Sequence, residues 1–276
     1  MEAGTIAIED YEFIRRLVYD RSRINLGPNK AELVRSRVQK RLRALGMENF
    51  QSYCRLLESA AGEEEMTALL DVISTNVTDF FREVQHFDFL EAIVLPEWHR
   101  KTGSRLPFRV WSAACSSGEE PYSIAILLSE YGRTHRALDW SVTATDISTR
   151  MLTAAEQAVY RSDRVKLPDS EWLARYFQKG VGAREGFYRV KPGPREHVDF
   201  RHLNLFHWPY PFTEKFDVIF CRNVMIYFDR DTQQQLVPRL AEQLTPGGHL
   251  FVGHSESLIG IGRSLKSVQP SVYRHE

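Results

Sequence analysis

The chain has 276 residues, of which 43% are hydrophobic and 26% are charged, and its formal net charge is zero. This composition argues against a disordered chain and leaves room for one large domain and one small one. No apolar run approaches the ~18 residues of a membrane span, and the N-terminus lacks the basic start and apolar core of a signal peptide. We therefore expect a cytoplasmic protein that is not inserted in a membrane.

The cysteines and histidines give no sign of a disulfide framework or a metal site. Cys54, Cys115 and Cys221 are odd in number and far apart, which is typical of reduced thiols that act as small hydrophobic residues. The nine histidines show no paired ligand spacing, so we predict that no metal is bound.

Residues 1–86 are predicted to form a helical module, with breaks near residues 27, 46 and 62 and no strand pattern. Between residues 28 and 45, apolar residues recur at steps of three and four, which predicts an amphipathic helix that Gly46 ends. The surrounding segment 15–43 carries ten basic residues and two acidic ones, a local net charge of +8. Such a surface is either a solvated helix face or a docking surface for an acidic partner, and the sequence favours neither alternative.

Beyond residue 107 the pattern changes to strands that alternate with helices. Five apolar segments predict strands, and three amphipathic segments predict helices between them. This alternation predicts an α/β fold whose sheet is mostly parallel, with helices on both faces. The predicted strands are 108–114, 139–146, 197–204, 216–221 and 249–254, and the predicted helices are 117–131, 147–160 and 232–244.

A segment at about 160–195 interrupts this alternation. It contains a predicted short helix at 169–177, and then three glycines followed by the strand-like sequence FYRV. Glycines placed for tight turns predict a small antiparallel insertion. The C-terminal segment 264–276 is consistent with a closing hairpin.

Polar residues at the ends of two predicted strands indicate a ligand site. The apolar strand 216–221 ends abruptly in Arg222-Asn223 and a short aromatic turn. In open parallel sheets, ligands lie outside the carboxyl ends of the strands, so we expect Asn223 and Tyr227 to face a bound molecule. Asp146, at the end of strand 139–146, is placed to accept hydrogen bonds from both ribose hydroxyls of an adenosine.

The turn after the first predicted strand discriminates between adenosine ligands. It contains Gly118 but lacks the GxGxxG pattern, and Glu119 and Glu120 place negative charge where a pyrophosphate would bind a helix N-terminus. This argues against NAD or ATP and favours a cationic cofactor, S-adenosylmethionine. Either glutamate taken singly is also explained by the helix dipole.

Five motifs occur in order along nearly the whole chain: TNVTDFFRE (75–83), WSAACSSGEEPYSIA (111–125), ATDIS (144–148), FDVIFCRNVMIYFD (216–229) and GHSES (253–257). Together they resemble the CheR-type chemoreceptor glutamate methyltransferases. The resemblance implies an N-terminal helical domain, here 1–86, and a class I, Rossmann-like methyltransferase domain, here 87–276, with a β-subdomain inserted at about 160–195. It also implies methyl transfer from S-adenosylmethionine to receptor glutamates, with glutamate methyl esters and S-adenosylhomocysteine as products.

Position by position, the resemblance implies roles for particular residues. Asn76, Thr78 and Arg82 would bind the methionine end of the cofactor, and Asp146 would hold its ribose. Arg82 and Tyr227 would line the methyl-transfer site. Because a glutamate side chain is ionised near neutral pH, its attack on the sulfonium methyl group needs no general base. The complete implied cofactor set is Asn76, Thr78, Arg82, Glu120, Asp146, Asn204, Leu205, Arg222 and Asn223.

Two further surfaces are implied as contacts for a chemoreceptor. The basic helix would face the glutamate-rich methylation helices of the receptor's cytoplasmic bundle through Arg35, Arg37, Lys40, Arg41 and Arg43. The insertion has the length and glycine placement of family members that bind a receptor's C-terminal pentapeptide, and the matching positions are Lys179, Gly180, Gly182, Gly186 and Arg189. Lys179 stands where that subgroup has arginine. Because an ammonium group cannot form a bidentate pair with a carboxylate, the affinity of the insertion for a receptor tail is left open. A solvent-exposed hairpin without a ligand is the alternative.

Two other functional classes remain as alternatives. A nucleic-acid methyltransferase would share the cofactor sheet, but the turn RNVMIYF offers no Pro-Pro-aromatic platform for a flipped base and the chain is neutral overall. A non-catalytic module for receptor tails would require a degraded cofactor site, and the sequence shows none. We expect a monomer that binds no nucleic acid.

Overall fold

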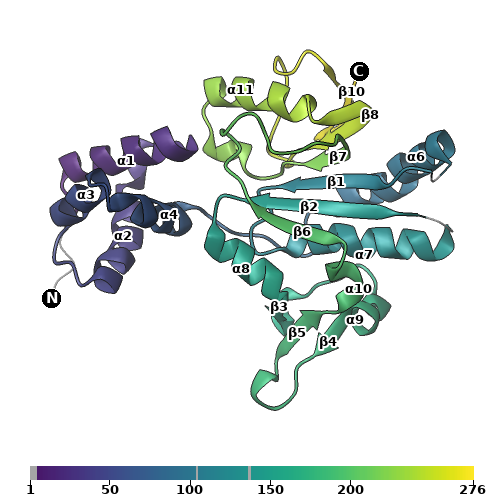
Figure 1. The fold of residues 1–276 in the computed structure, drawn as a ribbon, viewed down its shortest axis with the longest axis horizontal. Coiled ribbons are helices and arrows are strands. Elements are labelled where there is room, and N and C mark those ends of the chain that lie inside the picture. Colours follow the sequence, from purple (N-terminus) through teal and green to yellow (C-terminus); the bar gives the residue numbers. More distant parts are fainter. Residues whose placement is uncertain (1–4, 104, 136–137) are drawn as a thin grey trace.

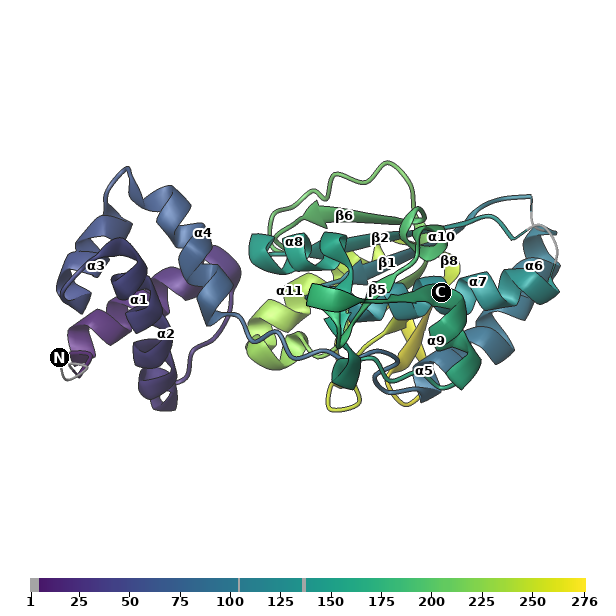
Figure 2. The same cartoon turned by 90° about the horizontal axis from the view of Figure 1, so that it is seen from below.

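The computed structural model describes residues 5–103, 105–135 and 138–276. Figures 1 and 2 show a small body of helices beside a larger α/β body, with the non-helical segment 74–84 leading from one to the other. A second, smaller sheet projects from the larger body at the lower edge of Figure 1.

The small body is built from α1 (Ile8–Ser22), α2 (Ala31–Leu45), α3 (Phe50–Glu58) and α4 (Gly62–Ile73). Their apolar faces pack into a core of their own, as the amphipathic pattern predicts. A 3-10 turn at Pro28–Lys30 precedes α2, so the helix begins slightly later than predicted. Gly46 ends it with φ +65°, a left-handed conformation that glycine adopts without steric cost.

The large body contains, within the described residues, a seven-stranded sheet of order β6-β2-β1-β7-β8-β10-β9. The strand β10 is antiparallel to β8 and forms a hairpin with β9, whereas the remaining neighbours are parallel. The prediction of a mostly parallel sheet with a closing hairpin is therefore confirmed. The strands are β1 (Phe108–Ala113), β2 (Trp140–Asp146), β6 (Val198–His202), β7 (Phe216–Phe220), β8 (Leu244–Phe251), β9 (Leu265–Gln269) and β10 (Val272–His275).

Helices cover both faces of this sheet (Figures 1 and 2). Val110 and Phe220 join one core with α5, α6 and α7, whereas Trp111 and Ile219 join another with α11. Because successive strand residues point to opposite faces, the two cores lie on the two sides of the sheet. The helices are α5 (Gln85–Phe89), which continues through a π-helical turn at Leu90–Val94 into α6 (Leu95–Thr102), then α7 (Glu119–Thr134), α8 (Thr149–Gln157) and α11 (Arg230–Ala241).

The insertion forms a three-stranded antiparallel sheet of order β3-β5-β4, which confirms its prediction. It comprises β3 (Val159–Arg161), α9 (Ser170–Tyr176), β4 (Phe177–Lys179), β5 (Phe187–Val190) and α10 (Pro192–Arg195).

Three predicted boundaries are wrong. Helix 147–160 is predicted too long, because α8 ends at Gln157, Ala158 adopts φ +54° and the following residues pair with β5. The last strand of the parallel set begins at Leu244 and not at residue 249, so the predicted helix 232–244 stops earlier, at Ala241. None of the helices in the described part of the chain combines the length and hydropathy needed to span a bilayer.

Candidate active site

A pocket opens at the carboxyl ends of the parallel strands. Its walls come from the turns after β1, β2, β6 and β7, from the linker 73–82, and from the segment 22–33 of the helical body. The ten residues predicted for cofactor binding and methyl transfer are brought together here, although they are spread over five segments of the sequence. They are Asn76, Thr78, Arg82, Glu120, Asp146, Asn204, Leu205, Arg222, Asn223 and Tyr227.

Asp146 lies at the end of β2 and is 6% exposed. Its Oδ2 accepts a hydrogen bond from the Ser116 N–H at 2.8 Å, and its Oδ1 accepts one from the Ser148 N–H at 2.8 Å. Burial raises the pKa of this carboxyl group, while the two main-chain donors act in the opposite direction. Each oxygen keeps a second lone pair, so the group is fixed in position and still able to accept two ligand hydroxyls.

Arg222 forms ion pairs with two carboxylates at the wall of the pocket. Its side chain is 1% exposed and lies between two carboxylates, with Nη2 3.0 Å from Glu83 Oε2 and Nη1 3.1 Å from Glu120 Oε2. Ser112 donates to the other oxygen of Glu120 at 2.6 Å. One guanidinium between two carboxylates leaves one excess negative charge in a buried setting, which attracts a cation.

The loop after β7 presents Asn223 and Tyr227 to the pocket, as predicted. Asn223 has φ +57°, and its Nδ2 donates to Glu83 Oε1 at 3.2 Å. The main-chain oxygen of Tyr227 accepts from Asn25 N–H at 2.8 Å, whereas its hydroxyl makes no hydrogen bond with any described residue. That hydroxyl is therefore available to a bound molecule.

The helical body supplies a wall of the pocket that the sequence did not indicate. Ile24, Asn25, Leu26, Lys30 and Leu33 line it. Two side-chain hydrogen bonds join the helical body to the sheet body. Asn204 Nδ2 donates to the main-chain oxygen of Arg21 at 2.7 Å, and the Tyr19 hydroxyl donates to Asp229 Oδ2 at 2.7 Å. No local pattern predicts such a wall, because it exists only through tertiary contact.

The five basic residues predicted for docking differ in their surroundings. Arg37 donates to the main-chain oxygens of residues 72–74 and so caps the end of α4. Arg41 forms a bidentate pair with the buried Glu65, at 2.8 and 2.7 Å. Arg35 pairs with Glu32, its neighbour on the same helix. Lys40 and Arg43 are exposed and pair with no described residue, so they carry the free positive charge of α2.

The predicted tail-binding residues lie in the inserted sheet, outside the pocket. Lys179 is opposite Tyr188 in the β4–β5 pair, and Arg189 is opposite Gln178. Because strand residues alternate between faces, Lys179 and Arg189 lie on opposite faces of the sheet. Gly182 and Gly186 have positive φ, and a Cβ on Gly180 would collide with the main-chain oxygen of residue 184, so the glycines shape the turn.

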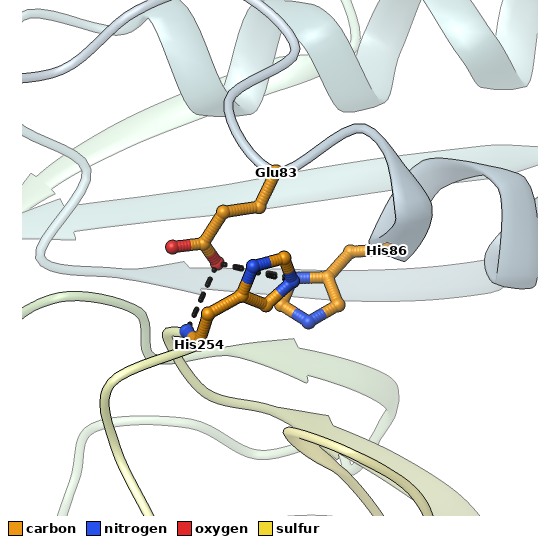
Figure 3. A group of neighbouring side chains, drawn as sticks. All are labelled: Glu83, His86 and His254. Carbon is orange, nitrogen blue, oxygen red and sulfur yellow. Dashed lines mark hydrogen bonds and ion pairs between the residues drawn. The ribbon is translucent and has the colours of Figure 1, made fainter.

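Glu83, His86 and His254 form a cluster beside the pocket (Figure 3). Glu83 Oε2 lies 3.5 Å from His86 Nδ1 and 4.0 Å from His254 Nε2. His86 is 1% exposed, neither of its ring nitrogens has a hydrogen-bond partner among the described residues, and burial together with Arg222 lowers its pKa to about 3. A carboxylate and two imidazoles are potential metal ligands. However, Glu83 Oε2 already accepts from Arg222, so a metal would have to displace a buried guanidinium. The absence of a metal stays a prediction.

Comparison with known proteins decides the family. The family model described as CheR methyltransferase, SAM binding domain, matches residues 76–273, and the one described as CheR methyltransferase, all-alpha domain, matches residues 9–74. The chain belongs to the CheR methyltransferase family. It is an S-adenosylmethionine-dependent methyltransferase of chemotaxis adaptation, which confirms the cofactor and the class of reaction that the sequence resemblance implied.

Individual relatives match this chain along nearly their whole length. The chemotaxis protein methyltransferase of Escherichia coli is 41% identical over 270 residues, which are 97% of this chain and 92% of the relative. The Salmonella typhimurium protein of the same description is 40% identical over 97% of this chain and 91% of its own. The Borreliella burgdorferi protein of the same description is 38% identical over 94% of this chain and 91% of its own.

The pocket fits S-adenosylmethionine. Asp146 offers a fixed pair of acceptors for a ribose, and the excess negative charge around Arg222 suits a molecule that carries a sulfonium and an ammonium group.

Proposed function

We propose that the protein transfers the methyl group of S-adenosylmethionine to glutamate side chains of chemoreceptors. One observation supports this acceptor above others: each carboxylate that lines the described part of the pocket already has a hydrogen-bond or ion-pair partner. Among the described lining residues there is no histidine. The three lining carboxylates are engaged, Asp146 by main-chain N–H groups, Glu120 by Arg222 and Asp79 by Arg164. An acceptor that enters already ionised, as a glutamate does, needs no base.

In this proposal the residues act by holding and orienting. Asp146 holds the ribose, Asn204 and Leu205 contact the adenine side, and Asn76, Thr78 and Arg82 bind the methionine end. Glu120, Arg222 and Asn223 complete the predicted cofactor set. When bound, S-adenosylmethionine supplies an electrophilic methyl group, and the glutamate oxygen that takes it loses no proton. Proximity and exclusion of water from the acceptor carboxylate supply most of the acceleration.

Arg82 and Tyr227 are proposed to orient the acceptor. Arg82 Nη1 donates to the main-chain oxygen of Val77 at 2.9 Å, which leaves its other donors toward the pocket. A bidentate grip by this guanidinium would reduce the nucleophilicity of the acceptor. The neutral Tyr227 hydroxyl can guide the same carboxylate with one weaker hydrogen bond, so we assign the closer contact to Tyr227.

Receptor docking is proposed to use the free charge on α2 and the inserted sheet. Lys40 and Arg43 are the docking residues best supported by the structure, because Arg37 and Arg41 stabilise the helical body itself. Arg189 and Lys179, on opposite faces, would contact different parts of a receptor tail. Because all ten predicted pocket residues come from one chain, a cytoplasmic monomer is sufficient for this function.

We also propose a domain boundary nearer residue 75 than the predicted residue 86. Phe80 and Phe81 are buried in the core of the sheet body, and the two family models meet between residues 74 and 76.

The test is transfer of an isotopically labelled methyl group from S-adenosylmethionine to a panel of acceptors. A receptor cytoplasmic fragment should become labelled, and the label should be lost in mild alkali, as expected of a methyl ester. Label in DNA or RNA would support the nucleic-acid alternative. Failure to bind S-adenosylhomocysteine would support the non-catalytic one.

A further inference from the structure

The main chain of the loop after β7, residues 222–227, donates hydrogen bonds to a buried carboxylate, Glu256. Glu256 lies in the GHSES segment that follows β8 and is 8% exposed. Its Oε2 accepts from Asn223 N–H at 2.9 Å and from Gly253 N–H at 2.5 Å, and its Oε1 accepts from Ile226 N–H at 3.2 Å. Three charge-assisted bonds to main-chain donors fix the backbone of both segments relative to each other.

The conformation of this loop brings it close to the GHSES segment. Asn223 adopts φ +57°, in the left-handed region, which asparagine tolerates better than most residues with a Cβ. The loop and the GHSES segment approach so closely that a Cβ on Gly253 would collide with Asn223 Nδ2 and lie 2.9 Å from Glu256 Oε2. Glu83 completes the arrangement, because it accepts from Asn223 Nδ2 at 3.2 Å and from the N–H of His254 at 3.3 Å.

A carboxylate is costly at this position. Among the described residues, no lysine, arginine or histidine forms an ion pair with Glu256, so main-chain donors alone oppose its charge. Burying an unpaired charge generally disfavours the folded state more than burying a neutral side chain. Glu256 therefore offsets the cost of its burial through the hydrogen bonds that join the pocket loop to the GHSES segment.

We propose that Glu256 is a positioning residue for the methyl-transfer site. It holds the loop so that Asn223 faces the cofactor and Tyr227 faces the acceptor. The part that concerns the acceptor rests on the proposed function, and the part that concerns the cofactor does not.

The test compares Glu256→Gln with Asp217→Asn. Glutamine keeps the shape but turns one accepting oxygen into an NH2 group that faces a main-chain N–H. Asp217 is a matched control, because it lies at the other end of β7, accepts from Arg109 N–H at 2.9 Å and does not line the pocket. Glu256→Gln should lower the affinity for S-adenosylhomocysteine, measured by calorimetry, by roughly tenfold, because the loop then occupies its binding conformation in only about a tenth of the molecules. Asp217→Asn should leave that affinity unchanged.

Two more measurements separate positioning from a general loss of stability. Hydrogen exchange of the peptide 222–228 should accelerate in Glu256→Gln and not in Asp217→Asn. The single-turnover rate of methyl transfer at saturating S-adenosylmethionine should also fall, because Tyr227 moves with the loop. Calorimetry needs no acceptor, so a wrong acceptor assignment would leave the binding result intact.

Gly253→Ala provides a second variant in which Glu256 remains. Its Cβ would collide with Asn223 Nδ2 and displace the same loop, so the same losses of affinity and rate are expected even where Glu256→Gln does not fold. The proposal is overturned by folded variants that keep wild-type affinity and rate. It is equally overturned by an affinity loss of the same size in Asp217→Asn.

Discussion

Replacing Asp146 by asparagine should weaken cofactor binding without a matching loss of fold stability. Each oxygen of Asp146 accepts one main-chain N–H and retains one lone pair for a ribose hydroxyl. Asparagine keeps only one accepting oxygen and removes the charge. Loss of one charge-assisted hydrogen bond, about 1.5–3 kcal/mol, corresponds to an affinity for S-adenosylhomocysteine that is roughly 10- to 150-fold lower.

The assay is isothermal titration calorimetry, with thermal unfolding measured on the same samples. Asp217→Asn is the matched control, because Asp217 also accepts a main-chain N–H but lies outside the pocket. We expect similar changes in Tm for the two variants and a loss of affinity in Asp146→Asn alone. Wild-type affinity in a folded Asp146→Asn protein would refute the ribose assignment.

Four further outcomes are expected. Tyr227→Phe should slow single-turnover methyl transfer and leave S-adenosylhomocysteine affinity nearly unchanged, and an unaltered rate would make Tyr227 a packing residue. Charge reversal at Lys40 and Arg43 together should lower methylation of receptor fragments, with an effect that shrinks as added salt screens it. Arg189→Ala should abolish binding of a receptor's C-terminal peptide yet spare transfer to receptor in excess, since tethering raises effective concentration; no binding of such peptides to the wild type would contradict the tether. His86 and His249, whose pKa values burial lowers to about 3 and about 4, bind a proton more readily in the unfolded chain, so each makes stability fall as pH drops below about 6.5. The contribution of His86 between pH 7 and 5.5 is roughly 1 kcal/mol, and His86→Phe should reduce the pH dependence by that amount in denaturant titrations.

Much of the pocket could be predicted from the sequence because of how parallel sheets are built. Asp146 and Asn223 follow apolar strands, and the carboxyl ends of parallel strands meet at one edge. The position of a polar residue at the end of an apolar strand therefore indicated which polar side chains meet at that edge. The resemblance added Asn76 and Arg82, which no strand pattern indicates.

The parts that the sequence did not indicate depend on contacts between distant segments. Ile24 and Asn25 line the pocket only because the helical body packs against the loop after β7. The contacts of Arg37 and Arg41 within the helical body could not be predicted for the same reason. Helical periodicity shows which face of a helix is charged but not which residues lie opposite that face. The end of α8 was also missed, because Ala158 adopts a left-handed conformation without glycine to signal it.

The position of the transferred methyl group distinguishes a receptor glutamate from every other acceptor. A receptor cytoplasmic fragment, treated with this protein and labelled S-adenosylmethionine, is digested and analysed by mass spectrometry. We predict alkali-labile methyl groups on glutamate side chains of the methylation helices and none after those glutamates are replaced by alanine. Stable label on lysine, arginine or a nucleic acid, with the receptor glutamates unmodified, would contradict this prediction.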